Sequence, residues 1–162
     1  MIFGRRADKR APLLTFERIL VPVAGTVADE PALRLAALLL GGSEEGHVLL
    51  LHVIEVPFEQ QLDAEDAGAI AFADEVLGRG ETLLGEREVQ ARTAISQARA
   101  AGAAIVDEAV EQRADLIVMG LRYKKRFGGG WDAGRTVPYV MRNSMAPVWC
   151  LRTETEDLAQ TP

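Results

Sequence analysis

Short apolar runs alternate along this chain with longer segments in which apolar residues recur at helical spacing. Three of the runs are almost continuously apolar, which is typical of strands buried on both faces of a sheet. Another run alternates apolar and polar positions, as in a strand with one more polar face. The pattern predicts five strands, at 19–23, 48–56, 89–96, 116–119 and 147–151.

The segments between these strands predict four helices. In the first, Thr26 and Asp29 have the spacing of a capping box, and Gly41 stops the helix. The second ends near Arg87, but its start is open between Asp63 and Ile70 because the stretch 57–69 is polar and acidic. The remaining helices are expected near 101–113 and 135–144, the last one preceded by a loop at 121–133.

Alternating strands and helices predict an α/β fold. Right-handed crossovers then give a single doubly wound, three-layer domain around a five-stranded parallel sheet. In such sheets a ligand binds beyond the carboxyl ends of the strands, where the strand order reverses. Two segments follow strands at this edge, 23–26 and 120–136, and they are the candidate site.

Composition restricts the class of protein. The length of 162 residues is that of one ordinary domain. Cys150 is the single cysteine, which excludes an internal disulfide framework and a multi-cysteine metal site. The chain has no apolar run of the roughly 20 residues that a membrane helix needs, and its start has no secretory apolar region. We expect a cytoplasmic domain at 16–152, with a flexible basic arm at 1–15 and an acidic polar tail at 153–162.

The net charge of −6 is distributed unevenly. An acidic chain is a poor candidate for binding nucleic acid, and no membrane partner is expected. Residues 120–135, however, sum to +4, whereas the rest of the chain sums to −10. This basic segment indicates either a site for a small anion or a solvated basic loop.

Glycines and basic residues gather in the same segment, directly before the last predicted helix. Glycines allow backbone N–H groups to approach an anion, and a helix N-terminus offers unpaired donors and a positive dipole end. A flexible glycine loop without a ligand is the alternative. The residues concerned are Lys124, Lys125, Arg126, Gly128, Gly129, Gly130, Gly134 and Arg135.

Several segments resemble the universal stress protein family. They are the run at 19–23, Leu51-His52-Val53, the sequence ADLIVMG at 114–120, and Tyr139-Val140-Met141-Arg142 followed by Pro147-Val148. The resemblance covers about residues 16–152. It implies the adenine nucleotide alpha hydrolase-like fold with strand order 3-2-1-4-5, a role in stress response, and usually a homodimer. Many members bind ATP through a pattern G-x2-G-x9-G-[S/T], whereas others lack the pattern and bind none.

This sequence departs from that ATP pattern at several positions. Gly120 matches the first glycine, but Tyr123 occupies the place of the second. Gly134 matches the third glycine only with one extra residue in the spacer, and Arg135 stands where Ser or Thr is expected. After the first strand, Ala24 replaces the acidic residue that often holds adenosine in the family. The resemblance therefore leaves nucleotide binding open.

If a nucleotide binds, the resemblance implies a definite arrangement of contacts. Val23, Ala24 and Val53 are expected near adenine, and Met119 and Gly120 beneath the ribose. The segment 128–136, which includes Thr136, is expected around the phosphate. ATP, ADP and AMP, with or without Mg²⁺, all remain candidates.

Three classes of function follow. The first is a regulatory module that binds an adenine nucleotide with little or no turnover; the second is a dimeric adaptor that needs no ligand. The third is a slow ATPase or a nucleotide-dependent ligase, although no catalytic residue or metal ligand is identified.

We expect dimerisation through the last strand, which would otherwise be an unprotected sheet edge. His52 is expected to be a packed strand residue rather than a ligand.

Overall fold

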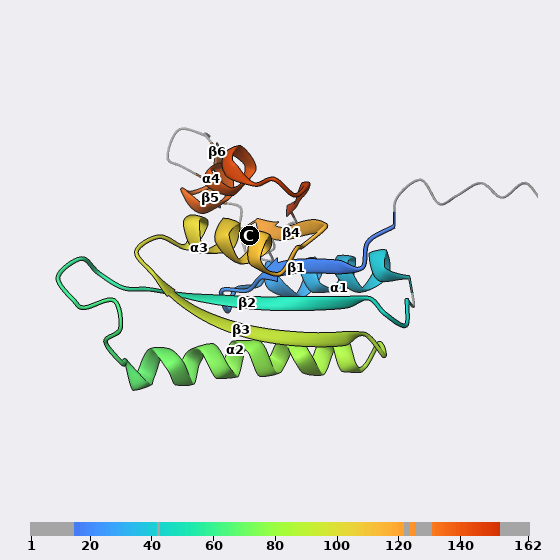
Figure 1. Cartoon of the computed structure of the whole chain (residues 1–162), viewed down its shortest axis with the longest axis horizontal. Coiled ribbons are helices and arrows are strands. Elements are labelled where there is room, and N and C mark those ends of the chain that lie inside the picture. The colour runs from blue at the N-terminus through green and yellow to red at the C-terminus, as the bar shows by residue number, and fades with distance from the viewer. Residues whose placement is uncertain (1–14, 42, 122–123, 126–130, 153–162) are drawn as a thin grey trace, which may run out of the picture.

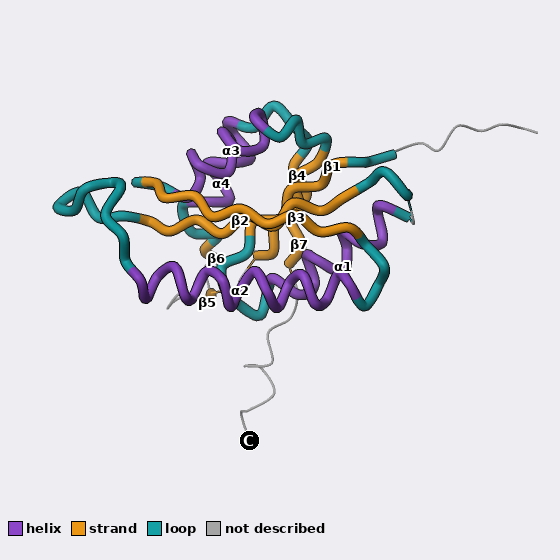
Figure 2. The backbone as a smooth tube through the Cα atoms, turned by 60° about the horizontal axis from the view of Figure 1, so that its bottom comes forward, coloured by secondary structure: helices purple, strands orange, loops and turns teal. Residues whose placement is uncertain are grey.

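The computed structural model describes residues 15–41, 43–121, 124–125 and 131–152. At its centre lies a five-stranded parallel sheet with helices on both faces, as Figures 1 and 2 show. The strand order is β3-β2-β1-β4-β7, which is the predicted order 3-2-1-4-5 when the strands of this sheet are counted along the chain. The predicted doubly wound α/β fold is therefore confirmed.

The secondary structure agrees with the sequence pattern to within one or two residues at most strand ends. The strands of the sheet are β1 (Arg18–Pro22), β2 (His47–Glu55), β3 (Gln90–Ala98), β4 (Leu116–Leu121) and β7 (Val148–Arg152). The helices are α1 (Asp29–Leu40), α2 (Ala67–Gly85), α3 (Ala101–Glu111) and α4 (Thr136–Asn143).

The segment between β4 and α4 contains strands that the sequence did not predict. Here β5 (Lys124–Lys125) pairs antiparallel with β6 (Trp131–Asp132). The prediction of a plain loop over 121–133 was wrong in this respect. Two-residue strands are too short to produce a recognisable hydrophobic period.

The two faces of the sheet bury separate hydrophobic cores. Successive side chains of a strand point to opposite faces, so Val21 of β1 packs under α1 and α2, and Leu20 packs under α3 and α4. Both side chains are fully buried. This two-sided burial explains why the central strands are continuously apolar in the sequence.

The start of α2, which the sequence left open, is fixed by a capping side chain. The Asp66 carboxylate accepts hydrogen bonds from the backbone N–H groups of Gly68 at 2.9 Å and Ala69 at 3.1 Å.

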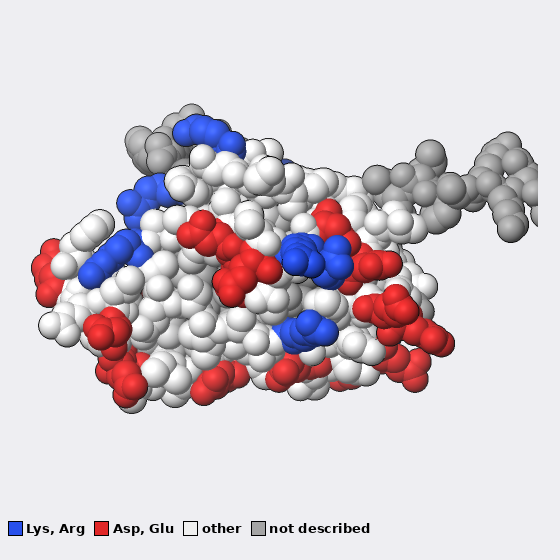
Figure 3. All heavy atoms as spheres, in the orientation of Figure 1, with Lys and Arg blue, Asp and Glu red and all other residues white. Residues whose placement is uncertain are grey.

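Helix α2 runs along the lower edge of the molecule in Figure 1, and Figure 3, in the same orientation, shows acidic side chains along this edge. None of the helices in the described part of the chain is long and apolar enough to cross a membrane.

Helix α2 lies very close to β2 because Gly80 has no side chain. A Cβ at this position would lie well inside van der Waals contact with the Leu50 side chain, which is fully buried. A Cβ at Gly78, two residues earlier in the helix, would instead extend into open space. Gly78 and Gly80 therefore differ in what an added methyl group would meet.

This difference predicts opposite effects of the same substitution. Gly78→Ala should stabilise the protein by up to about 1 kcal/mol, because alanine is the better helix former. Gly80→Ala gains the same propensity but overpacks Leu50, so its free energy of unfolding should be lower than that of Gly78→Ala by about 1–3 kcal/mol. Urea denaturation of both variants measures this difference. Equal stability of the two would show that α2 does not rest on Leu50.

Candidate functional site

A cavity of about 300 Å³ opens at the carboxyl edge of the sheet, on the face covered by α3 and α4. Apolar side chains from the ends of three neighbouring strands form much of its wall, including Val23, Val53 and Met119. Polar groups come from Thr26 and Asp29 on one side and from the start of α4 on the other. A mostly apolar pocket with a few convergent polar groups is typical of a small-molecule site.

Half of the residues that the sequence singled out line this cavity. They are Val23, Ala24, Val53, Met119, Gly120, Gly134 and Thr136. The structure thus brings together the ends of β1, β2 and β4 with the start of α4. Whether these residues hold a ligand stays a prediction.

The other predicted residues fall into three groups. Arg135 lines a neighbouring cavity of about 310 Å³, which shares Ala101 and Thr136 with the first. Lys124 and Lys125 belong to β5, of which only the backbone is described. The remaining predicted residues lie outside the described residues: Arg126, Gly128, Gly129 and Gly130.

The turn between β1 and α1 is organised around one carboxylate. Backbone N–H groups of Ala24, Gly25 and Thr26 donate to Asp29 Oδ2 with N···O distances of 3.1, 2.7 and 3.1 Å. The Thr26 hydroxyl donates to Asp29 Oδ1 at 3.2 Å and accepts from the Ala28 N–H at 3.3 Å. The Asp29 carboxylate thus accepts from the Thr26 N–H, as a capping box requires, but the N-cap of α1 is Ala28, and the Thr26 hydroxyl does not accept from the Asp29 N–H. The capping box expected from the sequence is therefore only half formed.

This arrangement has a consequence for anion binding. Three successive N–H groups that converge on one point form a concave anion site. In this chain Asp29 supplies the anion from within the protein. A ligand phosphate would have to displace that carboxylate, so the turn after β1 is a poor phosphate site.

The N-terminus of α4 offers the alternative. Its N-cap residue, Arg135, makes no capping hydrogen bond with its side chain. The first helical residues, Thr136 and Val137, line the 300 Å³ cavity, and their N–H groups belong to the helix turn that has no intrahelical acceptor. Gly134 adopts a φ of 69°, a left-handed conformation that favours glycine at this bend. The geometry suits an anion next to Thr136.

Gly120 has a packing role that the sequence did not reveal. A Cβ at this position would lie well inside van der Waals contact with the Ala28 carbonyl oxygen. The end of β4 therefore lies directly against the turn that precedes α1. This close approach brings Met119 and the turn residue Thr26 to the same cavity.

The neighbouring cavity contains two charged residues that sequence reasoning missed. Glu55 at the end of β2 accepts a hydrogen bond from the Ala101 N–H at 2.8 Å and so caps α3. Arg99 donates to the carbonyl oxygens of Val56, Pro57 and Gln60 and lies over the Phe58 ring. Arg99 thus holds the loop after β2, whereas Glu55 holds the start of α3, and no sequence motif marks either residue.

His52 is a packed residue, as expected. Its exposed fraction is 7%, its Nδ1 donates to the Val23 carbonyl oxygen at 2.9 Å, and its ring meets Phe72 edge-on with 5.7 Å between centroids. Within the described residues no group of three or more His, Cys, Asp or Glu side chains is placed to hold a metal ion. The features of the site that could select a ligand are therefore its shape and its hydrogen-bonding groups.

Comparison with known proteins gives a family-level result. The model of the universal stress protein family matches residues 15–152. No curated protein matches the chain.

Solved structures with this fold include ligand complexes. A universal stress protein from Archaeoglobus fulgidus has a TM-score of 0.68 and 23% identity, over 83% of this chain and 98% of that one. The A. fulgidus protein in complex with dAMP gives 0.64 and 21%, over 85% and 98% of the two chains. A family member from Arabidopsis thaliana with AMP bound gives 0.65 and 16%, over 87% and 94%. At these identities the similarity shows a shared fold.

The role of Asp29 generates a prediction about stability. Asp29→Ala removes the acceptor of three N–H groups, so the free energy of unfolding should fall by about 1–2 kcal/mol. Glu30→Ala is the matched control, because Glu30 makes only an exposed ion pair with Arg34, worth at most about 1 kcal/mol. Urea denaturation of both variants measures the effects. If Asp29→Ala costs no more than Glu30→Ala, the carboxylate does not hold the turn.

Proposed function

Because the chain belongs to the universal stress protein family, we propose that it is a regulatory module that binds an adenine nucleotide, with little or no turnover. The observation that carries this proposal is the 300 Å³ cavity with apolar walls and an uncapped helix N-terminus at one end. Solved proteins of the same fold in complex with dAMP and with AMP support the ligand class.

The proposed orientation follows from the chemistry of the cavity walls. Adenine lies against Val23, Ala24 and Val53, which offer an apolar surface for a flat ring. The ribose lies over Met119, and the phosphate reaches the α4 N-terminus at Thr136. The reverse orientation would place the phosphate beside the Asp29 carboxylate, where like charges repel.

Regulation follows from binding that favours one conformation. A phosphate held at the start of α4 would bias the segment 120–136 toward the conformation that binds it. The surface that this segment presents to a partner protein would then depend on nucleotide. The cytoplasmic location, the stress response and the part played by Mg²⁺ stay predictions from the sequence.

A ligand-independent adaptor is the second candidate, and a specific observation favours it. Ala24 removes the acidic side chain expected after β1, and Asp29 already occupies the N–H groups of that turn. A nucleotide therefore loses contacts on one side of the cavity. Turnover of ATP is the third candidate, and steady release of ADP above background would support it.

Nucleotide binding is tested directly by titration. We expect AMP, ADP or ATP, with or without Mg²⁺, to bind in isothermal calorimetry, and nucleotide to be released when the purified protein is denatured. Arg135→Ala with Thr136→Val should weaken AMP binding about tenfold, a loss of roughly 1.4 kcal/mol in phosphate contacts, and leave adenosine binding unchanged.

Arg142→Ala is the matched control, because Arg142 is a basic residue in the last turn of the same helix. It should leave AMP binding unchanged. Absence of binding at millimolar nucleotide would sink the proposal in favour of the adaptor. Equal weakening of AMP and adenosine by the Arg135 and Thr136 changes would contradict the proposed orientation.

We also propose that the chain forms a homodimer through β7. This strand pairs with β4 on one side and lies at the edge of the sheet in the single chain. Its half-buried Trp149 and Leu151 add apolar surface at this edge. Antiparallel pairing of two β7 strands across a two-fold axis would cover the edge.

The single cysteine offers a test of this dimer. Cys150 is the central residue of β7, so a two-fold axis through the middle of the strand sets the two thiols opposite each other, about 4.5–5.5 Å apart at Cα. Burial raises the pKa of the Cys150 thiol, so little of it is the reactive thiolate at neutral pH. Mild oxidation at alkaline pH should therefore produce a disulfide-linked dimer more rapidly than at neutral pH.

Cys150→Ser is the control for this reaction. It should abolish the covalent dimer and still show twice the monomer mass by light scattering. A strictly monomeric mass for the unmodified protein would contradict the proposal. A dimeric mass without a disulfide would place the two-fold axis away from Cys150.

A further inference from the structure

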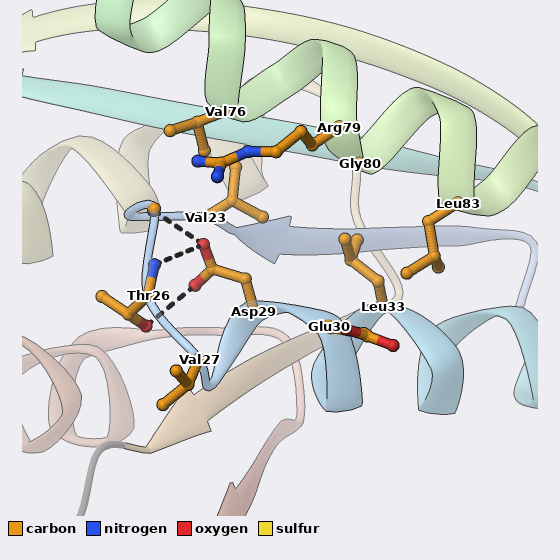
Figure 4. Close-up of a pocket in the computed structure, with 11 residues that line it drawn as sticks. Val23, Thr26, Val27, Asp29, Glu30, Leu33, Val76, Arg79, Gly80 and Leu83 are labelled. Atoms are coloured by element: carbon orange, nitrogen blue, oxygen red, sulfur yellow. Dashed lines mark hydrogen bonds between the residues drawn. The ribbon is translucent and has the colours of Figure 1, made fainter.

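A second cavity, of about 400 Å³, lies on the opposite face of the sheet, between α1 and α2 (Figure 4). Leu33 of α1 and Leu83 of α2 point toward one another across it, and Val23 and Val76 extend the apolar wall. We call this cavity the helix groove. The cavity of about 300 Å³ at the carboxyl edge, proposed above to bind a nucleotide, is called the nucleotide cavity here. The helix groove meets it only through Val23, Thr26 and Asp29, at the β1–α1 turn and the start of α1.

Two glycines lie in closely packed parts of the wall of the helix groove. Gly80 of α2 and Gly25 of the turn both line it, and a Cβ at Gly80 would meet the Leu50 and Leu33 side chains rather than open space. A Cβ at Gly25 would press against the Phe72 ring, and its φ of 75° is a left-handed conformation that favours glycine. A larger residue at either position would therefore strain the structure around the groove.

The charged side chains around the helix groove differ in how strongly they are already engaged by other groups of the protein. Of the two lining carboxylates, Asp29 is held by the N–H groups of the turn, and Glu30 is paired with Arg34. Among the described residues that line the groove, Arg79 is the only basic one. Its guanidinium lies 3.9 Å from Glu75 in a pair whose side chains are 61% and 66% exposed, an interaction of little strength.

The Arg79 side chain also points in a direction that suits a ligand in the helix groove. Its side chain extends from α2 along the helix groove, past Val76 and toward the β1–α1 turn (Figure 4). A guanidinium in this position offers several N–H donors to one carboxylate or sulfonate. If a ligand anion replaced Glu75 as the partner of Arg79, the free energy lost with the exposed pair would be small.

We propose that the helix groove binds a small amphipathic anion, whose apolar body lies between Leu33 and Leu83 and whose carboxylate pairs with Arg79. The apolar wall supplies affinity through burial, and the guanidinium selects an acid over the corresponding alcohol. This site is separate from the proposed nucleotide site, with which it shares only residues of the β1–α1 turn and the start of α1. Its ligand lies on the other face of the sheet.

The test compares two probes with the same chain length, decanoate and decanol. Each is titrated into the full-length protein at low salt, and amide chemical shifts are followed by NMR. Decanoate should shift the amides of Gly25 and Gly80, which line the helix groove. Arg79→Glu should weaken decanoate binding about tenfold and change decanol binding less than twofold.

Arg87→Glu is the matched control, because it makes the same charge change just after α2, outside the lining of the helix groove. It should change decanoate affinity less than twofold. Leu83→Trp fills the helix groove and should abolish binding of both probes, whereas Val53→Trp fills the nucleotide cavity and should leave both intact.

The opposite results overturn the proposal. They are no shift at Gly25 and Gly80 with millimolar decanoate, equal effects of Arg79→Glu and Arg87→Glu, or loss of binding in Val53→Trp rather than Leu83→Trp. If Leu83→Trp fails to fold, the comparison of the two arginine variants decides, because both residues are exposed. None of these outcomes depends on whether a nucleotide binds.

Discussion

The hydrogen bonds to the Asp29 carboxylate are the interaction on which two cavities of this protein depend. The carboxylate gathers the N–H groups of Ala24, Gly25 and Thr26 and thereby fixes the turn that leads from the central strand β1 into α1. The same turn forms a wall of the 300 Å³ cavity on one face of the sheet and of the helix groove on the other. A change in this turn would therefore alter both walls at once.

The carboxylate also gives the carboxyl edge an electrostatic direction. Asp29 places negative charge at the end of β1, whereas the start of α4 presents uncapped N–H groups and the nearby Arg135. A bound anion is favoured at one end of the cavity and disfavoured at the other. The apolar residues between them, such as Val53 and Met119, suit the uncharged part of a ligand. This polarity is what distinguishes the cavity from a simple gap between strands.

Close backbone contacts keep these parts in register. Gly120 lets the end of β4 lie against Ala28, and Gly80 lets α2 lie against Leu50 of β2. The first contact brings the end of β4 to the 300 Å³ cavity, and the second sets the distance between the sheet and α2, which forms one wall of the helix groove. In both cases a missing side chain decides the position of a whole element. The sequence shows the glycines but not the atoms that they accommodate.

The sequence by itself determined the five-stranded α/β fold, its approximate element boundaries and the edge at which a ligand site belongs. It could do so because continuous apolar runs report strands buried on both faces, and parallel strands with crossover helices must bring their carboxyl ends together. It also paired Thr26 with Asp29, which do form hydrogen bonds, because such contacts depend on residues close together in the chain; the N-cap of α1, however, is Ala28 and not Thr26.

Only the tertiary structure decided which residues meet at that edge. It brought Val23, Val53 and Thr136 together in one cavity and placed Arg135 in the neighbouring one. It also showed that the Asp29 carboxylate accepts the hydrogen bonds of the backbone N–H groups after β1. It also produced the helix groove, whose walls come from helices separated in the sequence by the whole of β2. These contacts depend on how elements pack, and a hydrophobic period carries no information about which distant side chains will face one another.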